Sequence, residues 1–426
     1  MRSSRPFYGL YLALASAMLL LSQAGLAAAL TGDARSSGNW IVNGSETVSG
    51  VTEVWHGNIT VSATGQLTMS NSAFVFNSSS LVRYGITVEK GGRLSMVNSR
   101  LASVNASEGF WFLAEGSVEI RDSRIENVFA GTTGLNWIGG FRIRSDSPVI
   151  ENTVLMGSLG YFVRFEGCNN VLFTGNTITN ASTALFLNRS KGVVKDSLFT
   201  NNSDRHIVIE SCDGVEVLNN KLNDTGAGAF IVSMSRNIES RGNYYEGGLY
   251  GVYARDAIIQ MEGDNVTGAV VCIDAEEGSK ITLIDCLYDK ESVAANSGSQ
   301  VVVRRTIKVR AVAGSKSVSG ASVTVRDSNK NQLAEATTDD DGKAEFTITE
   351  LLVTEEGAAE GSPFRFKAVK GIRSVSRTFA TLGTEELELK MALPWAFIIG
   401  AALFIVLAAF VVASPPRTRK SRKKPR

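Results

Sequence analysis

The middle of the chain, residues 59–290, repeats one short pattern in which an apolar run ends at a small polar corner. Successive corners lie 20 to 30 residues apart, at Asn71, Asn98, Asp122, Asn152, Asn176, Asp196, Asn219, Asn243, Asp264 and Asp285. Self-similarity with a period of about 20–30 residues indicates a solenoid, in which each repeat stacks on its neighbours. We therefore expect this part of the chain to wind into stacked turns.

Each repeat has the pattern of β-strands. Apolar and polar residues alternate with a period of two in Leu94–Leu101 and Val118–Ile125, and this alternation predicts strands. No window keeps the spacing of an amphipathic helix. Turns made only of strands pair at about 4.8 Å, so like residues stack and a corner Asn can hydrogen-bond to its copies in adjacent turns.

The phrases Val171–Ile178 and Val215–Leu222 carry a family resemblance. With them, over half of the chain resembles the right-handed parallel β-helix proteins of the pectate-lyase-like group and their NosD-like relatives. The resemblance implies an all-β fold with a right-handed parallel β-helix. It does not imply one activity, because this fold hosts lyases, hydrolases, adhesins and spacers alike.

The domains are predicted in chain order. Residues 1–29 have a basic start, an apolar run and small residues at the end, which predicts a signal peptide, with an uncleaved anchor as the alternative. Residues 30–300 are predicted to form the β-helix, with Trp40 and Trp55 covering its first turn. Residues 301–391 contain alternating strands spaced about ten residues apart, which predicts a small β-sandwich.

The predicted sandwich contains a turn whose sequence resembles that of known sandwich domains. Thr338–Ala344 resembles a turn of the transthyretin-like and carboxypeptidase-regulatory-like sandwiches, and the resemblance implies a spacer domain. Its aspartates at 339–341 could bind Ca²⁺, but we interpret a short exposed turn of this kind as solvated.

The C-terminal segment predicts a membrane anchor. Residues 392–413 are predicted to form one transmembrane helix, because 393–413 contain no charge and about 20 apolar residues span a bilayer. Residues 414–426 contain seven basic residues and no acid, so the positive-inside rule predicts a cytoplasmic tail. The expected localisation is the cell membrane, with a single span and the body outside the cell. This arrangement resembles archaeal surface β-helix proteins.

The charge distribution argues against a nucleic-acid partner. The whole chain has a formal net charge of +1. Leaving out the seven basic residues of the tail and the two arginines of the N-terminal segment, the remainder carries −8. A mildly acidic body lacks the basic footprint of a nucleic-acid-binding protein.

The part of the chain outside the membrane is predicted to be a glycoprotein. Sequons for N-glycosylation, Asn-x-Ser/Thr, point to surface positions in a secreted protein. The candidates are Asn43, Asn58, Asn77, Asn105, Asn180, Asn188, Asn201, Asn223 and Asn265. Chance sequons are the alternative in a chain this rich in Asn, Ser and Thr.

The four cysteines are interpreted as small buried residues. Cys168 and Cys212 hold the same phase two turns apart, which places them about 9.6 Å apart at the usual strand spacing. A disulfide requires Cα atoms within about 7 Å, so we predict no bond between them. Cys272 and Cys286 fall in one turn and could face each other, so a disulfide between them is left as a possibility.

Aligning the strands from residue 141 onward separates inward from outward side chains. The expected interior columns are Phe141, Val163, Leu185, Ile207 and Phe230, and Ile143, Phe165, Leu187, Ile209 and Val232. The outward set includes Arg142, Arg144, Arg164, Glu166 and Glu210, which could hold a carboxylated or sulfated sugar. The resemblance supports this, since related enzymes hold acidic polysaccharide on such a face. The alternative is a surface ladder in which Arg144 pairs with Glu166, worth under about 1 kcal/mol.

Catalysis is not predicted. Glycoside hydrolysis needs two carboxylates about 5–9.5 Å apart, and Glu166 and Glu210 lie two turns apart with Asn188 between them. Polygalacturonase signatures are absent from the coil. His56 and His206 are the only histidines, which argues against a histidine relay or a copper cluster, and therefore against the copper-related role of NosD-like proteins. We therefore expect no catalytic residue, no cofactor and no metal.

The sequence thus predicts a membrane-anchored extracellular β-helix protein with a binding or structural role, such as envelope architecture, adhesion or glycan binding. Its partners would be the membrane and an extracellular polysaccharide or other envelope proteins. A membrane-tethered polysaccharide lyase or glycoside hydrolase acting on acidic glycans is one alternative. A spacer without a ligand is another.

Overall fold

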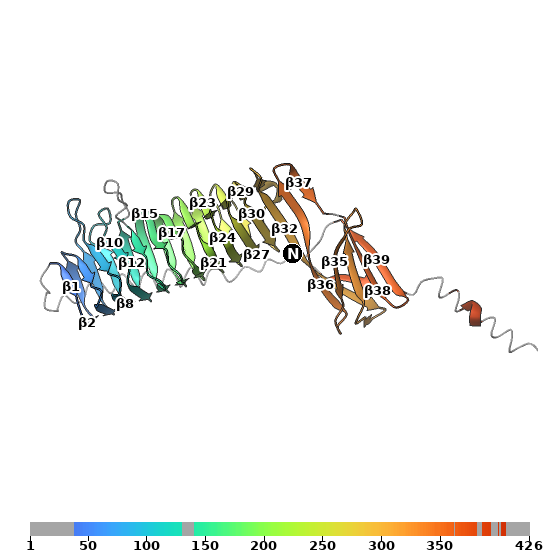
Figure 1. Cartoon of the computed structure of the whole chain (residues 1–426), viewed down its shortest axis with the longest axis horizontal. Helices are drawn as coiled ribbons and strands as arrows, with labels where there is room; N and C mark the ends of the chain where they lie inside the picture. Colours follow the sequence, from blue (N-terminus) through green and yellow to red (C-terminus); the bar gives the residue numbers. More distant parts are fainter. Residues whose placement is uncertain are drawn as a thin grey trace, which may run out of the picture. The chain divides into compact units, whose positions relative to one another are not determined.

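The computed structural model describes residues 38–129, 140–361, 363–380, 386–392, 399 and 402–405. Nearly all described elements are β-strands (Figure 1). The described chain forms two compact units. Unit 1 contains residues up to 253 together with 265–273, and unit 2 contains 254–264 together with the residues from 274 onward. Strands β26 (Tyr250–Arg255) and β29 (Val271–Glu276) include residues of both units.

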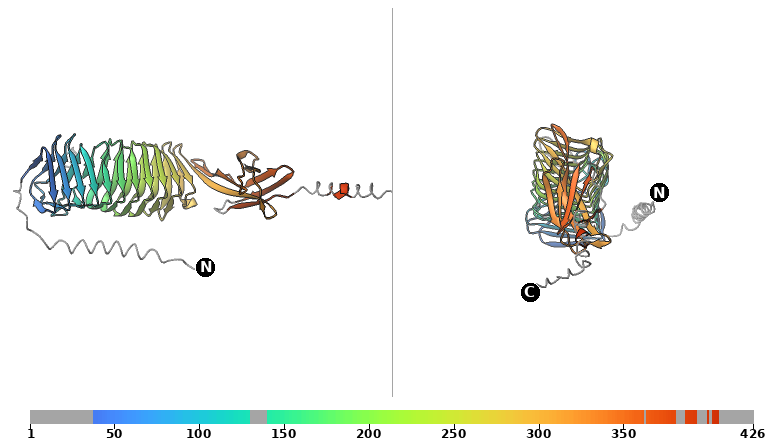
Figure 2. Two further views of the ribbon diagram at one scale, coloured as in Figure 1. Left: turned by 90° about the horizontal axis from the view of Figure 1, so that it is seen from below. Right: turned by 90° about the vertical axis from the view of Figure 1, so that its right-hand side faces the viewer.

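Unit 1 is a parallel β-helix with three strands in each turn, stacked rung on rung (Figure 2). Its second row contains β2 (Ser45–Ser49), β5 (Gln66–Ser70), β8 (Arg93–Val97), β11 (Ser117–Arg121), β14 (Val149–Glu151), β16 (Val171–Thr174), β18 (Gly192–Lys195), β21 (Asp213–Leu218) and β24 (Arg236–Arg241). Every pair in this row is parallel, as predicted for a solenoid of strands.

The other two rows share long strands. The first row contains β1 (Trp40–Val42), β4 (Ile59–Val61), β7 (Gly85–Val88), β10 (Trp111–Ala114), β13 (Phe141–Ile143), β20 (Arg205–Glu210) and β23 (Gly228–Ser233). The third contains β3 (Thr52–Trp55), β6 (Ala73–Phe76), β9 (Arg100–Ser103), β12 (Arg124–Val128), β19 (Leu198–Asn202), β22 (Lys221–Thr225), β25 (Tyr244–Glu246) and β28 (Asn265–Thr267). Strands β15 (Val154–Glu166) and β17 (Thr177–Asn188) run through a corner and serve both rows.

The interior columns match the prediction. Phe165 pairs with Leu187, and Leu187 pairs with Ile209, in directly adjacent strands. All three side chains are fully buried, as are the other residues of the two predicted columns. At the first turn, the rings of Trp40 and Trp55 lie 5.8 Å apart and both contact Phe74.

The corner alignment needs one correction. At Asn71, Asn98, Asp122, Asn152, Asp196, Asn219 and Asp285 the backbone has a positive φ, as a tight corner requires. At the other three predicted corners, the positive φ belongs to the preceding glycine, namely Gly175, Gly242 or Gly263. Asn176, Asn243 and Asp264 therefore lie one position later and are buried. Glycine adopts positive φ without a steric cost, so the corner did not need Asn there.

Those buried positions belong to a polar column that the sequence did not predict. Ser72, Ser99, Ser123, Thr153, Ser197 and Asn220 hold the same phase as Asn176 and Asn243. From Ser99 onward, each residue of the column accepts the backbone N–H of the column residue in the preceding turn. For example, Ser197 N donates to Asn220 Oδ1 at 3.0 Å, and Asn220 N donates to Asn243 Oδ1 at 2.8 Å. The column supplies acceptors to buried backbone donors at the corner.

All four cysteines are free and buried. Cys168 N donates to Ser190 Oγ, and Ser190 N contacts Cys212 Sγ. The intervening serine confirms that Cys168 and Cys212 are two turns apart and not bonded. Burial raises the pKa of Cys168 to about 11 and that of Cys286 to about 12, so these thiols are unreactive near neutral pH.

Unit 2 begins with parallel rungs. Strand β27 (Ile258–Glu262) pairs with β30 (Lys280–Ile284), and β30 pairs with Gln300–Arg304 at the start of β32 (Gln300–Ala313). The predicted boundary at 300/301 falls inside β32, which also pairs antiparallel with β36 (Lys343–Thr354). The shorter elements here are η2 (Lys290–Ser292), β31 (Val293–Ala295), β33 (Lys316–Ser317), β37 (Gly357–Glu360) and β40 (Leu387–Lys390).

A four-stranded antiparallel sheet completes unit 2. Its order is β35 (Gln332–Thr337), β34 (Ser322–Arg326), β38 (Phe364–Lys370) and β39 (Arg373–Phe379). Residues from this sheet, β32, β36 and β40 share one core that includes Ile307, Val323, Phe346, Phe366 and Leu389. The likeness to regulatory sandwich domains stays a prediction.

The predicted signal peptide at 1–29, the transmembrane helix at 392–413 and the tail at 414–426 lie almost wholly outside the described residues. Within the described part of the chain, no helix has the length and apolar character to cross a bilayer.

We predict that Asn220→Ala lowers the free energy of unfolding by about 2–4 kcal/mol, because it leaves Ser197 N and Val194 O without their side-chain partner. Urea and thermal denaturation measure the change. Asn219→Gly is the matched control, since Asn219 is exposed with φ 53° and glycine accepts that conformation. Equal losses in the two variants would contradict a special role for the buried column.

His206 gives a prediction about pH. It is fully buried, and Asn202 Nδ2 lies 3.0 Å from its Nδ1. Burial lowers the pKa of His206 from 6.5 to about 4. Its stabilising contribution is therefore present above pH 6.5 and lost as the pH falls toward 4, by on the order of 3 kcal/mol. Unfolding curves of the wild type and His206→Gln should diverge in this window, and parallel curves would contradict the assignment.

Candidate functional site

The strand register brings three of the predicted outward arginines together. Arg142 on β13 lies directly beside Arg164 on β15. Arg144 follows β13, and Glu166 ends β15. We call these four residues the arginine face. Like charges in adjacent rungs repel each other, so the arrangement requires a compensating group.

Glu166 is that group. Arg142 Nε donates to Glu166 Oε2 at 2.7 Å, and Arg144 Nε donates to the same oxygen at 3.0 Å. Arg164 forms an ion pair with Oε1 of the same carboxylate. The Glu166 side chain is only 11% exposed. The predicted Arg144–Glu166 ladder is therefore present, within a larger cluster of three guanidinium groups around one carboxylate.

The electrostatics keep Glu166 ionised. Burial raises the pKa of Glu166, but hydrogen bonds from Arg142 and Arg144 and the charge of Arg164 outweigh burial, so the net pKa is lowered. A general acid of a glycosidase needs a raised pKa. Glu166 is thus suited to organise arginines and is poorly suited to donate a proton.

Aromatic rings border the arginine face. The guanidinium of Arg164 lies 4.9 Å from the ring centre of Phe186 and 5.6 Å from that of Tyr161, at distances typical of cation–π contacts. The two rings are 5.0 Å apart. Phe186 lies in register with Arg164 and with Val208. Phe186 and Val208 are both buried, so the row that begins with Arg142 and Arg164 continues into covered apolar side chains.

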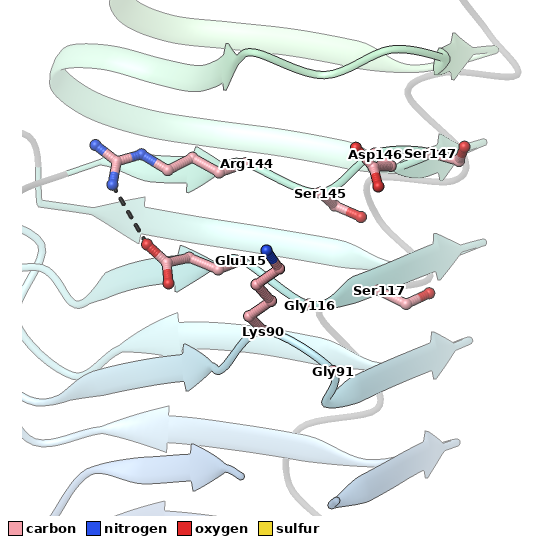
Figure 3. Close-up of a pocket in the computed structure, with 9 residues that line it drawn as sticks. All are labelled: Lys90, Gly91, Glu115, Gly116, Ser117, Arg144, Ser145, Asp146 and Ser147. Atoms are coloured by element: carbon pink, nitrogen blue, oxygen red, sulfur yellow. Dashed lines mark hydrogen bonds and ion pairs between the residues drawn. The ribbon is translucent and has the colours of Figure 1, made fainter. Parts of the chain in front are cut away.

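A groove lies next to Arg144 (Figure 3). It has a volume of about 740 Å³ and is lined by Lys90, Gly91, Glu115, Gly116, Ser117, Arg144, Ser145, Asp146 and Ser147. Arg144 Nη1 lies 3.4 Å from Glu115 Oε1. Figure 3 shows that the lining residues come from successive turns. The groove therefore offers charged and hydroxyl groups of several rungs to one ligand.

The sequence interpretation missed Lys90, Glu115 and Asp146. The strand alignment began at residue 141, although Val88 and Ala114 pair in the same row. Extending the alignment to earlier turns would have placed Glu89, Lys90 and Glu115 at the end of their strands. The depth of the groove could not have been found in this way, since it depends on the geometry of the turns.

Glu210 is not part of this cluster. It lies in the same row as Glu166, with Asn188 between them, so two rung spacings, about 9.6 Å, separate the backbones. Among the described residues, no ion pair involves Glu210. Four of the five predicted binding residues are therefore neighbours in the arginine face, and the fifth, Glu210, lies apart from them.

A second arrangement of the same kind lies in the third row. Arg100 pairs in register with Arg124, and both guanidinium groups bind Glu126, whose side chain is 8% exposed. A groove of about 680 Å³ borders these residues and the corner residues Asn98 and Asp122. Stacked arginines compensated by one nearly buried glutamate therefore recur in this coil.

The structure places the nine sequons at accessible or partly accessible positions. The exposed asparagines are Asn43, Asn77, Asn105, Asn180 and Asn201, and the half-buried ones are Asn58, Asn188, Asn223 and Asn265. Asn201 Nδ2 donates to Asn180 Oδ1, so in Asn201 the nitrogen that a glycan would modify is a hydrogen-bond donor. Glycosylation stays a prediction.

Among the described residues, no group of three or more His, Cys, Asp or Glu side chains is placed to hold a metal ion. In the Asp339–Asp341 turn, Asp339 Oδ1 accepts the backbone N–H groups of Asp341 and Lys343. This carboxylate is therefore used by the turn itself.

Comparisons with known proteins agree with the fold. The family described as "Right handed beta helix region" matches residues 109–257 and 139–288. The chain therefore contains a right-handed β-helix. No curated protein sequence matches the chain.

Several solved structures are similar in shape. A mutant of the periplasmic alginate epimerase AlgG is 10% identical, with a TM-score of 0.43 over 57% of this chain and 76% of that chain. Tailspike protein 2 from Escherichia coli O157:H7 bacteriophage CAB120 is 11% identical, with a TM-score of 0.30 over 81% of this chain and 65% of that chain. At these identities and scores, neither likeness bears on what this chain does.

We predict that Glu166→Gln lowers the free energy of unfolding by roughly 1–3 kcal/mol, because it leaves three adjacent guanidinium groups with a neutral partner. Urea titration at low and high salt measures the change, and salt should reduce it. Glu210→Gln in the same row is the control, with an expected change within about 0.5 kcal/mol. Equal effects would show that the cluster does not stabilise the coil.

Proposed function

We propose that this chain is a non-catalytic β-helix protein of the cell surface, anchored by residues 392–413 with its body outside the cell. We further propose that the arginine face and the adjoining groove hold an acidic extracellular glycan. Membrane anchoring is supported by the uncharged run at 393–413 and the basic residues that follow it.

The observation that carries the glycan proposal is the charge balance of the arginine face. Arg142, Arg144 and Arg164 face two carboxylates, Glu166 and Glu115. An excess of positive charge thus remains on a surface built from stacked rungs. Guanidinium groups bind carboxylates and sulfates through paired hydrogen bonds, and the half-buried ring of Tyr161 nearby offers apolar surface for a sugar ring.

A binding role fits this geometry better than catalysis. The low pKa of Glu166 removes the proton that a general acid would supply. Glu210, the second carboxylate of the row, lies two rungs away and outside the arginine cluster. A bound acidic polymer would instead meet the guanidinium groups of two neighbouring rungs, those of Arg142 and Arg164.

The test is binding of the purified protein to polygalacturonate, a carboxylated polysaccharide, and to heparin, a sulfated one. We expect Arg142→Ala with Arg144→Ala to weaken binding to at least one of them about tenfold, the loss of roughly 1.4 kcal/mol from charge-assisted contacts. Glu166→Gln should keep or strengthen binding, because it frees guanidinium groups. Biolayer interferometry at several salt concentrations measures both effects.

Arg236→Ala with Arg241→Ala on β24 is the matched control, since it removes two arginines from another row. An unchanged affinity in the Arg142/Arg144 variant, or no binding to either polymer, would overturn the glycan proposal and favour a spacer. Release of reducing or unsaturated ends from these polymers, lost in Glu166→Gln, would favour the lyase or hydrolase alternative.

A further inference from the structure

The hairpin between β38 and β39 presents an apolar residue between two basic ones. Lys370 pairs with Arg373 across a turn formed by Gly371 and Ile372. Gly371 has φ 55°, which suits the first position of a tight two-residue turn. Ile372 lies at the tip and is 52% exposed, and both neighbouring basic residues are exposed.

The described segment that precedes the predicted span lies beside this tip. After β40, Ala392 forms an antiparallel bridge with Ser374, and Ser374 N donates to Ala392 O at 3.4 Å. Ser374 is only two positions after Ile372. In an antiparallel pair the two chains run in opposite directions, so the segment that ends at Ala392 is directed toward Arg373 and the tip.

The tether from this bridge to the predicted membrane span is very short. The uncharged run starts at residue 393, and Trp395 follows three residues after Ala392. Three residues reach at most about 10 Å. Trp at the end of a span prefers the level of the lipid headgroups. A bilayer that contains residues 393–413 must therefore begin close to the hairpin tip.

We propose that the Lys370–Arg373 hairpin docks onto the outer surface of the bilayer. Ile372 enters the boundary between headgroups and acyl chains, while Lys370 and Arg373 contact lipid phosphates. This inference rests on the proposed membrane anchor and goes beyond it. A single span alone allows unit 2 to swivel, whereas a second contact at the tip fixes its orientation to the membrane.

The acidic turn at Asp339–Asp341 does not oppose this docking. It follows β35, while the tip precedes β39, and these two strands are at opposite edges of the four-stranded sheet. The turn lies nearer to Lys370, whose ammonium group is beside Gly320, because the adjacent Ser319 Oγ donates to Asp340 Oδ1. Arg373 is on β39, about three strand spacings or 14 Å from β35, and salt screens charges beyond about 8 Å, so Arg373 keeps its basic character toward a phosphate surface.

The test uses the full chain reconstituted in lipid nanodiscs that contain phosphatidylcholine with or without phosphatidylglycerol. Cysteine replaces Ile372 in one variant and Leu333 in the control, and each carries an environment-sensitive fluorophore. Leu333 is 41% exposed near the start of β35, at the end of the sheet away from the tip. The native cysteines are buried and free, which favours selective labelling of the new thiol.

Spin-labelled lipids with the quencher near the headgroup provide the readout. We expect at least twofold stronger quenching at Ile372→Cys than at Leu333→Cys, and a further increase with phosphatidylglycerol. Equal quenching at both positions, in a chain that co-floats with lipid vesicles, would overturn the docking and leave the anchor intact. A chain that does not co-float would overturn the membrane anchor itself, and the docking with it.

Discussion

The fold depends on the way each turn of the coil satisfies the backbone of the turn beside it. Parallel strands supply most of these hydrogen bonds, but the corners interrupt the strands and leave buried N–H groups without a strand partner. The column of Ser, Thr and Asn side chains accepts these N–H groups one turn at a time. The column keeps neighbouring turns in the same phase at this corner. A slip by one residue would be costly, because it would bring apolar side chains to the surface.

The pairing of neighbouring strands explains the surface chemistry. Where two strands pair in phase, their outward side chains also stack, whether or not their charges agree. Arg142 beside Arg164 and Arg100 beside Arg124 are consequences of this constraint. In each case one nearly buried glutamate gathers the guanidinium groups. Compensation stabilises the coil and also leaves an organised basic surface, so structural and binding roles share the same residues.

Unit 2 uses one strand for two purposes. The first residues of β32 complete a parallel rung on β30, and the same strand pairs antiparallel with β36. Arg305, just after the irregularity in this pairing, lies 3.5 Å from Glu350. A continuous strand of this kind resists bending more than a flexible linker would. Because β32 belongs to both parts of unit 2, an orientation set at the hairpin tip would also affect the parallel rungs of this unit.

The sequence by itself determined the repeat, the all-β character, the interior columns through Phe165 and Leu187, and the separation of Cys168 from Cys212. These follow from a period of two within strands and a near-constant length of turn, both of which are local properties. The sequence placed Asn176 one position wrong, because glycine can replace Asn at a positive φ. Only the tertiary structure decided that three arginines meet at Glu166, that Lys90 and Asp146 line one groove, and that Ala392 lies beside the tip at Ile372. These depend on how turns of unequal length and distant strands meet in space, which no local pattern encodes.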